Sequence, residues 1–288
     1  MKQRTIAKEI ILSGRSLHFN KLIKIILKPA DVNKGIFITF KGKNIPLKID
    51  YVCEELCIRR TTLKYDEVEV NTTEHLLSAL GGMKIDNLEI SIETENKDNI
   101  IEFPILDGAA YTYTRAIMQA GIIEQEEKKD FFTYPYPIIK QIENSYFAYI
   151  PTNELIITYT IYYPHFLIGY QTYSLNIDEE SYYREIARAR TFCTIEEVDL
   201  LRKKGLIKGG SLKQALVIGK ETYLNDELYY NNEPVRHKIL DFLGDLKLLG
   251  KEARGHFIIS MGGHKTHVAF IKKIKKMEED YVREKSNI

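Results

Sequence analysis

This chain of 288 residues has few cysteines, no long apolar run and almost no net charge. Cys53, Cys57 and Cys193 form an odd and sparse set, which excludes a disulfide framework and favours a reducing compartment. Cys53 and Cys57 lack a second pair, so a cysteine-rich zinc site is not expected. No segment reaches the ~18 uninterrupted apolar residues of a membrane-spanning helix, and Gly14 interrupts the apolar N-terminal stretch. We therefore expect a cytoplasmic protein without a transmembrane segment.

The charge balance narrows the function classes further. The formal net charge is +1, which argues against a nucleic-acid-binding protein driven by bulk electrostatics. Hydrophobic residues make up 44% and charged residues 28%, a globular rather than a disordered composition. The length allows one large domain or two ordinary domains, each with its own core.

Hydrophobic periodicity alternates along the chain between a strand period and a helix period, which predicts an α+β fold. Residues 121–130 are charged and low in apolar periodicity, so they are a candidate boundary between two halves. The tail, residues 272–288, is expected to be a charged helix or a frayed end. No internal repeat is visible at the residue level. Strands are predicted at residues 24–27, 35–40, 87–92, 146–150 and 155–162, and helices at residues 111–118 and 182–187.

The segment around His237 carries the strongest chemical signal. If it is helical, His237, Asp241 and Asp245 are spaced by four and share one face. An imidazole and a carboxylate one turn apart can bind a divalent cation, while the second carboxylate orients a neighbouring group. Asn232 and Pro234 are typical of a helix start just before these residues. The alternative is a solvated polar stripe.

A second segment pairs Glu74 with His75. Asn71 or Thr72 can cap a helix whose first turn contains both residues. A capping box between Asn71 and Glu74 is the structural alternative, and it leaves His75 unexplained. An imidazole ligand beside a carboxylate suits a metal site with a general base, which explains both residues.

Two further segments have both a functional and a structural interpretation. Gly262 and Gly263 before His264 allow the backbone to bring this imidazole close to another element, although a surface turn explains them equally well. Thr194 begins a predicted capping box, followed by a helical stripe that contains Ile195 and Leu201. That stripe either packs the core of a small βαβ-like excursion or lines an apolar passage.

Short motifs occur in a fixed order from about residue 4 to about residue 275. Each is weak alone, but their joint order and spacing resembles UDP-3-O-acyl-N-acetylglucosamine deacetylase, the metal-dependent amidase family of lipid A biosynthesis. The motifs are Thr72-x-Glu74-His75-Leu76-Leu77, residues 102–108, Ala189-Arg190-Thr191-Phe192, Gly209-Gly210-Ser211, residues 232–238 with Asp241, Gly244-Asp245-Leu246, and Gly263-His264.

The resemblance implies a metal-dependent hydrolase. It places the metal ligands at His75, His237 and Asp241, and the general base at Glu74. Zn²⁺ with three protein ligands and an open position would suit amide hydrolysis, and ligand identity alone does not separate Zn²⁺ from Fe²⁺. The expected reaction releases acetate from UDP-3-O-acyl-N-acetylglucosamine and leaves the free 2-amine, a committed step of lipid A biosynthesis.

The remaining catalytic roles also follow from the resemblance. His264 matches the residue with the proton-donor or electrostatic role, and Asp245 is its expected carboxylate partner. Thr191 and Lys238 match positions that polarise the amide carbonyl and stabilise the oxyanion. Phe192 matches an aromatic residue that packs near the sugar and the acyl chain.

Substrate contacts are expected at His18 and along the apolar passage, where the resemblance places Ile195 and Leu201 beside the 3-O-acyl chain. The family's N-terminal glycine-rich loop is altered here, because residues 14–20 keep His18 but lose two glycines and a hydroxyl. Lys64, Lys265 and His267 also depart from common family choices. None of these departures affects the expected metal ligands or Glu74.

The resemblance further implies two α+β sandwich domains of similar topology with the active site between them. We expect the first domain at residues 1–124, the second at residues 130–275, a charged tail at residues 276–288, and a monomer. Two other functions fit part of the pattern: a non-haem iron oxygenase, whose facial triad also uses two histidines and a carboxylate, and a sugar-nucleotide- or lipid-binding protein with a structural metal.

Overall fold

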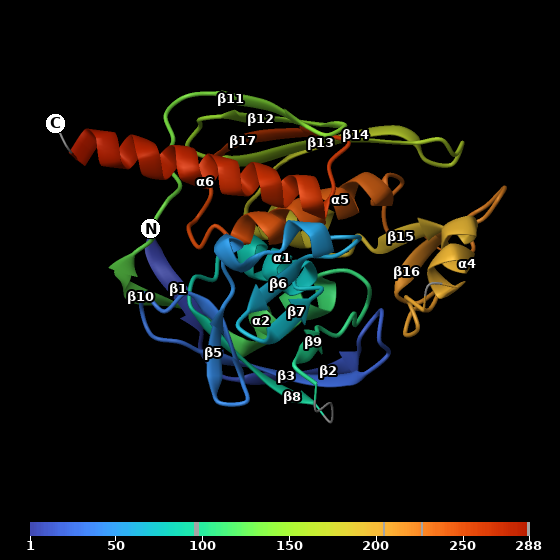
Figure 1. Ribbon diagram of the computed structural model, residues 1–288, viewed down its shortest axis with the longest axis horizontal. Coiled ribbons are helices and arrows are strands. Elements are labelled where there is room, and N and C mark those ends of the chain that lie inside the picture. Colours follow the sequence, from blue (N-terminus) through green and yellow to red (C-terminus); the bar gives the residue numbers. More distant parts are fainter. Residues whose placement is uncertain (95–97, 204, 226, 287–288) are drawn as a thin grey trace.

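The computed structural model describes residues 1–94, 98–203, 205–225 and 227–286. Two five-stranded sheets form its outer layers, and the helices stack between them (Figure 1). Helices α1 (Glu74–Gly82) and α2 (Tyr111–Ala120) accompany the first sheet, and α5 (Glu233–Lys247) and α6 (His264–Ser286) accompany the second. The mixture of sheets and separate helices confirms the predicted α+β fold.

The first sheet packs one face on the helices. Its strand β3 (Leu22–Pro29) shows the reason, because Ile23, Ile25 and Leu27 are buried at every second position, as the two-residue period of a strand requires. The predicted strands in this half are confirmed. In spatial order the sheet consists of β2 (Ile10–Arg15), β3 (Leu22–Pro29), β8 (Leu88–Thr94), β4 (Ile36–Phe40) and β5 (Lys43–Pro46).

The second sheet repeats this topology. In each sheet the third and fourth strands in spatial order pair in parallel, and the remaining neighbouring pairs are all antiparallel. The order of the strands along the chain is also the same, although the sequence shows no repeat at the residue level. In spatial order the second sheet consists of β11 (Ile138–Ile142), β12 (Ser145–Ile150), β17 (Gly255–Ser260), β13 (Leu155–Tyr163) and β14 (Gly169–Asn176).

One connecting region differs from the sequence prediction, whereas the tail confirms its helical alternative. The charged segment at residues 121–130 contains a strand, β10 (Ile122–Lys128), which pairs with β1 (Lys2–Ile6). Pairing with a distant strand supplies order that local polarity does not indicate. The tail continues α6 through Ser286 and is anchored, because the buried Glu278 accepts a hydrogen bond from the backbone N–H of Thr133 at 2.7 Å. The last predicted tail residues, 287–288, lie outside the described residues.

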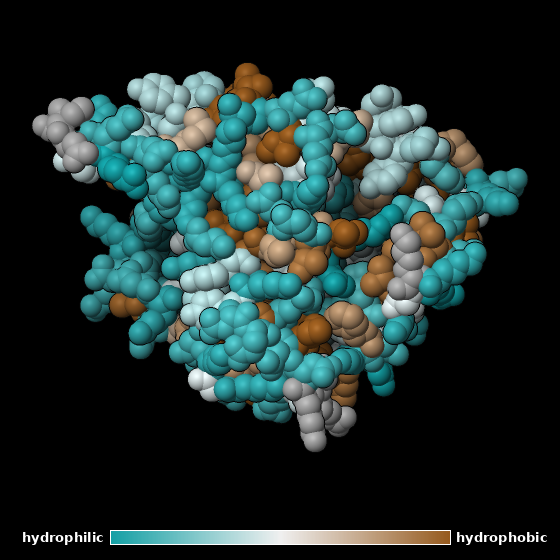
Figure 2. Space-filling model, in the orientation of Figure 1, coloured by the Kyte–Doolittle hydropathy of each residue, from teal (hydrophilic) through white to brown (hydrophobic). Residues whose placement is uncertain are grey.

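A small insert projects from the second half. Strands β15 (Thr191–Thr194) and β16 (Ala215–Ile218) pair in parallel, and α4 (Ile195–Lys203) lies between them in sequence. The predicted capping box at Thr194 is present, since its hydroxyl accepts from the N–H of Glu197 at 3.3 Å while the Glu197 carboxylate accepts from the N–H of Thr194 at 2.9 Å. The insert extends away from the sheets, and hydrophobic side chains are exposed in this region of the surface (Figures 1 and 2).

The remaining elements are short. The predicted helix at residues 182–187 begins earlier than expected, because Asp178 and Ser181 form a capping box. Within the described part of the chain, no helix has the length and apolarity needed to cross a bilayer. The remaining short elements are β6 (Thr62–Tyr65), β7 (Val68–Asn71), β9 (Ile100–Glu102), the 3₁₀ turns η1 (Ile49–Tyr51) and η2 (Glu54–Leu56), and α3 (Glu179–Glu185).

Candidate active site

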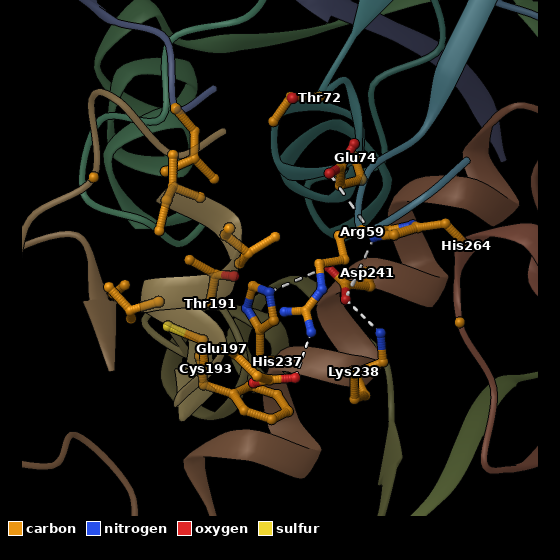
Figure 3. A pocket seen from close by; sticks show the side chains of 18 of the residues that line it. Arg59, Thr72, Glu74, Thr191, Cys193, Glu197, His237, Lys238, Asp241 and His264 are labelled. Carbon is orange, nitrogen blue, oxygen red and sulfur yellow. Dashed lines mark hydrogen bonds and ion pairs between the residues drawn. The ribbon is translucent and has the colours of Figure 1, made fainter. Parts of the chain in front are cut away.

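A cavity of about 600 Å³ opens between the two halves and the insert. Every site residue predicted from the sequence lines this cavity except Asp245, which lies behind His264. Figure 3 shows side chains from both central helices and from the insert facing the same space. The lining includes His18, Glu74, His75, Thr191, Phe192, Ile195, Leu201, His237, Lys238, Asp241 and His264.

A close approach of α1 and α5 brings the two halves of the site together. A Cβ atom at Gly244 on α5 would lie 2.1 Å from the carbonyl oxygen of Glu74, so a side chain there would separate the helices. Helix α1 begins at Glu74, and Thr73 in the N-cap position makes no side-chain cap hydrogen bond. The capping box considered between Asn71 and Glu74 is wrong: the side-chain Oδ1 atom of Asn71 accepts from the Thr62 hydroxyl instead.

His75, His237 and Asp241 converge on one point. The Nε2 atom of His237 lies 3.2 Å from Asp241 Oδ1, the Nε2 atom of His75 lies 4.0 Å from that oxygen, and the three ligand atoms lie within 4.8 Å of one another. All three side chains are buried. This cluster can therefore hold a metal ion.

The proton positions in this cluster favour a cation. The Nδ1–H group of His237 donates to the carbonyl oxygen of Ala189 at 2.9 Å, and burial lowers the His237 pKa, so the neutral ring presents a lone pair at Nε2. Asp241 Oδ1, which faces that lone pair, has no hydrogen-bond partner among the described residues. Two buried acceptor atoms at this distance repel each other unless a positive ion lies between them.

Lys238 holds the other oxygen of Asp241. Its Nζ atom lies 2.7 Å from Asp241 Oδ2. Burial alone would raise the Asp241 pKa, but the neighbouring positive charges of Lys238 and His264 lower it well below its usual value. Burial alone would lower the Lys238 pKa, but Asp241 raises it. The pair is ionised at neutral pH, with Asp241 Oδ1 left free to act as a ligand.

Glu74 and His264 form an acid–base pair across the cavity. The Oε1 atom of Glu74 lies 3.8 Å from His264 Nε2, while its Oε2 atom accepts from the backbone N–H of Thr61 at 3.1 Å. Burial raises the Glu74 pKa to about 7. Burial opposes charge on His264, but Asp245 and Asp241 raise its pKa to about 9. Near pH 8 the carboxylate can accept a proton and the imidazolium can donate one.

Asp245 is the predicted partner of His264, and it also binds two residues that sequence reasoning did not assign to the site. The Nδ1 atoms of His264 and His267 lie 2.8 and 2.9 Å from Asp245 Oδ2, and the Thr61 hydroxyl donates to Asp245 Oδ1. Asp245, His264 and His267 also satisfy metal-site distances, but hydrogen bonds account for their contacts. The sequence signal for His267 is its spacing of three residues from His264. The two residues share a helix face because α6 begins at His264.

The segment that carries Thr191 is fixed to the start of α5. The guanidinium of Arg190 donates to the buried carboxylate of Glu233 at 2.8 Å. Thr191 follows at the start of β15 and lies on the cavity wall near His237 (Figure 3). The ring of Phe192 stands edge-on to His237 with 6.3 Å between the ring centroids. The predicted aromatic residue is therefore beside a candidate metal ligand.

The altered N-terminal loop still presents His18 to the cavity. The carboxylate of Glu102 accepts from the backbone N–H groups of His18 and Phe19 at 2.9 and 3.0 Å, and it also accepts from the Thr72 hydroxyl at 3.3 Å. This clamp fixes the loop despite the missing glycines. Within the part of the chain that the structure describes, both buried ring nitrogens of His18 lack a hydrogen-bond partner, and burial lowers the His18 pKa to about 4.

The insert supplies the apolar end of the cavity. Ile195, Val198 and Leu201 on α4 line it, together with Val217 on β16. At the mouth, Arg59 reaches across to Glu197 and forms an ion pair that the sequence did not predict (Figure 3). The βαβ excursion and the apolar passage are thus one structure, because the same stripe packs the insert and faces the cavity.

Comparisons with known proteins agree with this arrangement. The family described as UDP-3-O-acyl N-acetylglycosamine deacetylase (LpxC) matches residues 3–276. A UDP-3-O-acyl-N-acetylglucosamine deacetylase of Thermodesulfovibrio yellowstonii is 38% identical over 94% of this chain and 91% of its own length. Proteins of the same name from Chlamydia pneumoniae and Trichormus variabilis are 39% and 36% identical, over 94% and 95% of this chain and 96% and 98% of their own lengths. By both measures, this chain belongs to the UDP-3-O-acyl N-acetylglycosamine deacetylase family.

Proposed function

We propose that this chain is a zinc-dependent deacetylase that hydrolyses the N-acetyl amide of UDP-3-O-acyl-N-acetylglucosamine to acetate and the free 2-amine. The relatives bear this name, and the cavity combines a candidate metal cluster, a base, an acid and an apolar passage. One observation carries the proposal: the lone pairs of His237 and Asp241 face each other at 3.2 Å beside the Glu74–His264 pair.

The donor set fits zinc. His75, His237 and Asp241 would hold the ion through two imidazole nitrogens and one carboxylate oxygen, which is a common three-ligand set for catalytic zinc. When bound with an open position, zinc lowers the pKa of water towards ~7 and polarises a carbonyl group. The hydrogen bond from His237 to Ala189 fixes the tautomer that such a ligand needs.

The protein groups around this cluster supply the proton transfers. Glu74 would accept the proton of the attacking water, and His264, protonated and held by Asp245, would donate a proton to the departing amine. The Thr191 hydroxyl and the Lys238 ammonium would stabilise the charge that develops on the carbonyl oxygen. A single donor of this kind contributes on the order of 2.7–4 kcal/mol.

The cavity also accounts for the two ends of the substrate. The 3-O-acyl chain would follow the apolar wall that contains Ile195 and Leu201, and Phe192 would pack where sugar and chain meet. The ring nitrogens of His18, which have no hydrogen-bond partner in the described ranges, are available for hydrogen bonds with the sugar nucleotide. The sparse, unpaired cysteines support placing this reaction in the cytoplasm, and we propose a monomer.

Acetate release from UDP-3-O-acyl-N-acetylglucosamine, measured with and without a chelator, tests the proposal. We expect release by the untreated enzyme, loss with the chelator, and recovery when Zn²⁺ is added back. Recovery only with Fe²⁺ under anaerobic conditions would replace the metal and keep the reaction. Oxygen consumption with a 2-oxo acid and no acetate release would replace the reaction by that of a non-haem iron oxygenase. Metal binding without either reaction would favour a binding protein.

A further inference from the structure

The buried carboxylate behind His264 has more hydrogen-bond donors than its role as a simple partner requires. Asp245 Oδ2 accepts from both His264 and His267, at 2.8 and 2.9 Å, and the Thr61 hydroxyl donates to Oδ1. Asp245 and His267 are fully buried. Since both residues are shielded from water, a lost protein donor is not replaced by solvent.

The surroundings of His267 fix which nitrogen carries its proton. Burial lowers the His267 pKa to about 4, so the ring is neutral at physiological pH and has one N–H group. Its Nε2 atom lies 2.7 Å from the hydroxyl of Tyr159 on β13, whose pKa burial raises well above the usual value. The phenol therefore donates to Nε2, and the proton of His267 is left on Nδ1, facing Asp245.

This arrangement limits the rotation of the Asp245 carboxylate. His264 and His267 are three residues apart in the first turn of α6, so they approach the same oxygen from neighbouring positions on one helix face. The ring of His267 is itself held edge-on against Phe242, with 5.2 Å between centroids. Tyr159, His267 and Asp245 thus connect the second sheet to His264 through consecutive hydrogen bonds.

We propose that His267 is a positioning residue for the deacetylation reaction: its Nδ1–H group fixes the Asp245 carboxylate, which in turn directs His264 Nε2 into the cavity opposite Glu74. The inference rests on the proposed function, because it needs His264 to act in that reaction. His267 does not line the cavity, so its effect passes through Asp245 and His264.

Two amide substitutions separate the roles of the two ring nitrogens. The side-chain nitrogen of asparagine is as many bonds from Cα as Nδ1, and that of glutamine as many as Nε2. His267→Asn therefore keeps a donor towards Asp245 and loses the contact with Tyr159, whereas His267→Gln does the reverse. Both variants remove the same aromatic ring, so each is the control for the other's packing defect.

We expect His267→Asn to retain a kcat for acetate release close to that of the wild type. We expect His267→Gln to lower kcat by roughly 10–100-fold, the usual effect of losing a residue that orients a catalytic group, with an unchanged KM and metal content. In ¹⁵N-resolved spectra of the metal-free protein, the Nδ1–H proton of His264 should stay protected in the asparagine variant and exchange faster in the glutamine variant.

Equal losses of kcat in the two variants would show that His267 contributes packing alone and would overturn the proposal. If His267→Gln does not fold, the wild-type spectrum still decides, because a His267 proton on Nε2 rather than Nδ1 contradicts the proposed hydrogen bond. If the wild type releases acetate while the variants do not differ, the positioning role fails and the deacetylase function stands. If the wild type releases none, the proposed function fails first.

Discussion

The two halves of this protein share one sheet topology and contribute differently to the site. In the first half, the helix before the third strand of the sheet, α1, places Glu74 and His75 in its first turn. In the second half, the corresponding helix α5 places His237 and Asp241 in the middle of its length. The helices that follow these strands also differ, because α6 begins with His264, whereas α2 begins with Tyr111, which is outside the cavity lining.

The connections between the common elements differ even more. Between β5 and α1 the first half has two 3₁₀ turns and a hairpin, whereas between β14 and α5 the second half carries the β15–α4–β16 insert. The repeated sheets and helices thus hold the proposed reacting groups, and the unequal connections provide the apolar end of the cavity. Glu74 and His264 lie in different halves, so the proposed base and acid meet only across the contact between the halves.

The largest effect should follow from removing the base of the first half. Glu74→Gln keeps a side-chain oxygen that can accept from the N–H of Thr61 but cannot take a proton. We expect kcat for acetate release to fall by roughly 10²–10⁴-fold, with metal content unchanged. The matched control is Glu143→Gln, an exposed carboxylate of the cavity rim that pairs with Lys265, for which we expect near wild-type kcat. Equal losses in both variants would exclude Glu74 as a specific base.

The next effect concerns the contact between the halves. Gly244→Ala places a Cβ atom 2.1 Å from the carbonyl oxygen of Glu74, so α1 and α5 must separate. Overpacking of this kind lowers the free energy of unfolding by typically about 1–3 kcal/mol, measurable by denaturant titration, and it should also reduce metal affinity. Gly81→Ala on α1 is the control, because its nearest neighbour would be Leu243 Cγ at an ordinary 3.4 Å. Equal stability of the two variants would contradict the close packing of α1 against α5 at Gly244.

Much of this site could be predicted from the sequence because its chemistry lies in short helical spacings. His237 and Asp241 are four residues apart, and Glu74 and His75 are adjacent, so the sequence of each helix indicates its own part of the site. The joining of the two pairs could not be seen locally and was expected only through the family resemblance. It depends on Gly244, a residue whose role appears only when α1 is placed against α5.

Other features depended on contacts between distant segments. The Asn71 side chain accepts from the Thr62 hydroxyl and donates to the Glu69 carboxylate and to the carbonyl oxygen of Ile101, so the capping motif that its position suggests does not form. The charged strand β10 is ordered by pairing with β1, which local periodicity does not reveal. The repeated topology was likewise expected only through the family resemblance, since two sheets can share strand order and pairing without sharing residues.

An effect of comparable size, on specificity rather than stability, should separate the insert from the rest of the second half. Leu201 on α4 is buried and lines the apolar end of the cavity, whereas the adjacent Leu200 is 53% exposed. We expect Leu201→Trp to shorten the preferred acyl chain, because displacing three or four methylenes at ~0.8 kcal/mol each costs roughly 2–3 kcal/mol. The readout is kcat/KM against substrates of graded chain length. Leu200→Trp should leave that chain-length preference unchanged. An equal shift of the preference in both variants would contradict the proposal that Leu201 on α4 lines the acyl passage.

The smallest effect is expected from a change of pH. On each side of the optimum the rate should change about tenfold per pH unit, and each side should report a group from one half. Glu74 of the first half must be ionised, so activity rises with pH up to about 7, or to a lower pH when a bound cation favours the carboxylate. His264 of the second half must be protonated, so activity falls as pH passes about 9. kcat/KM measured from pH 5 to 10 should therefore be bell-shaped. A rate that keeps rising above pH 9 would contradict the acid role of His264 and leave the base of the first half unaffected.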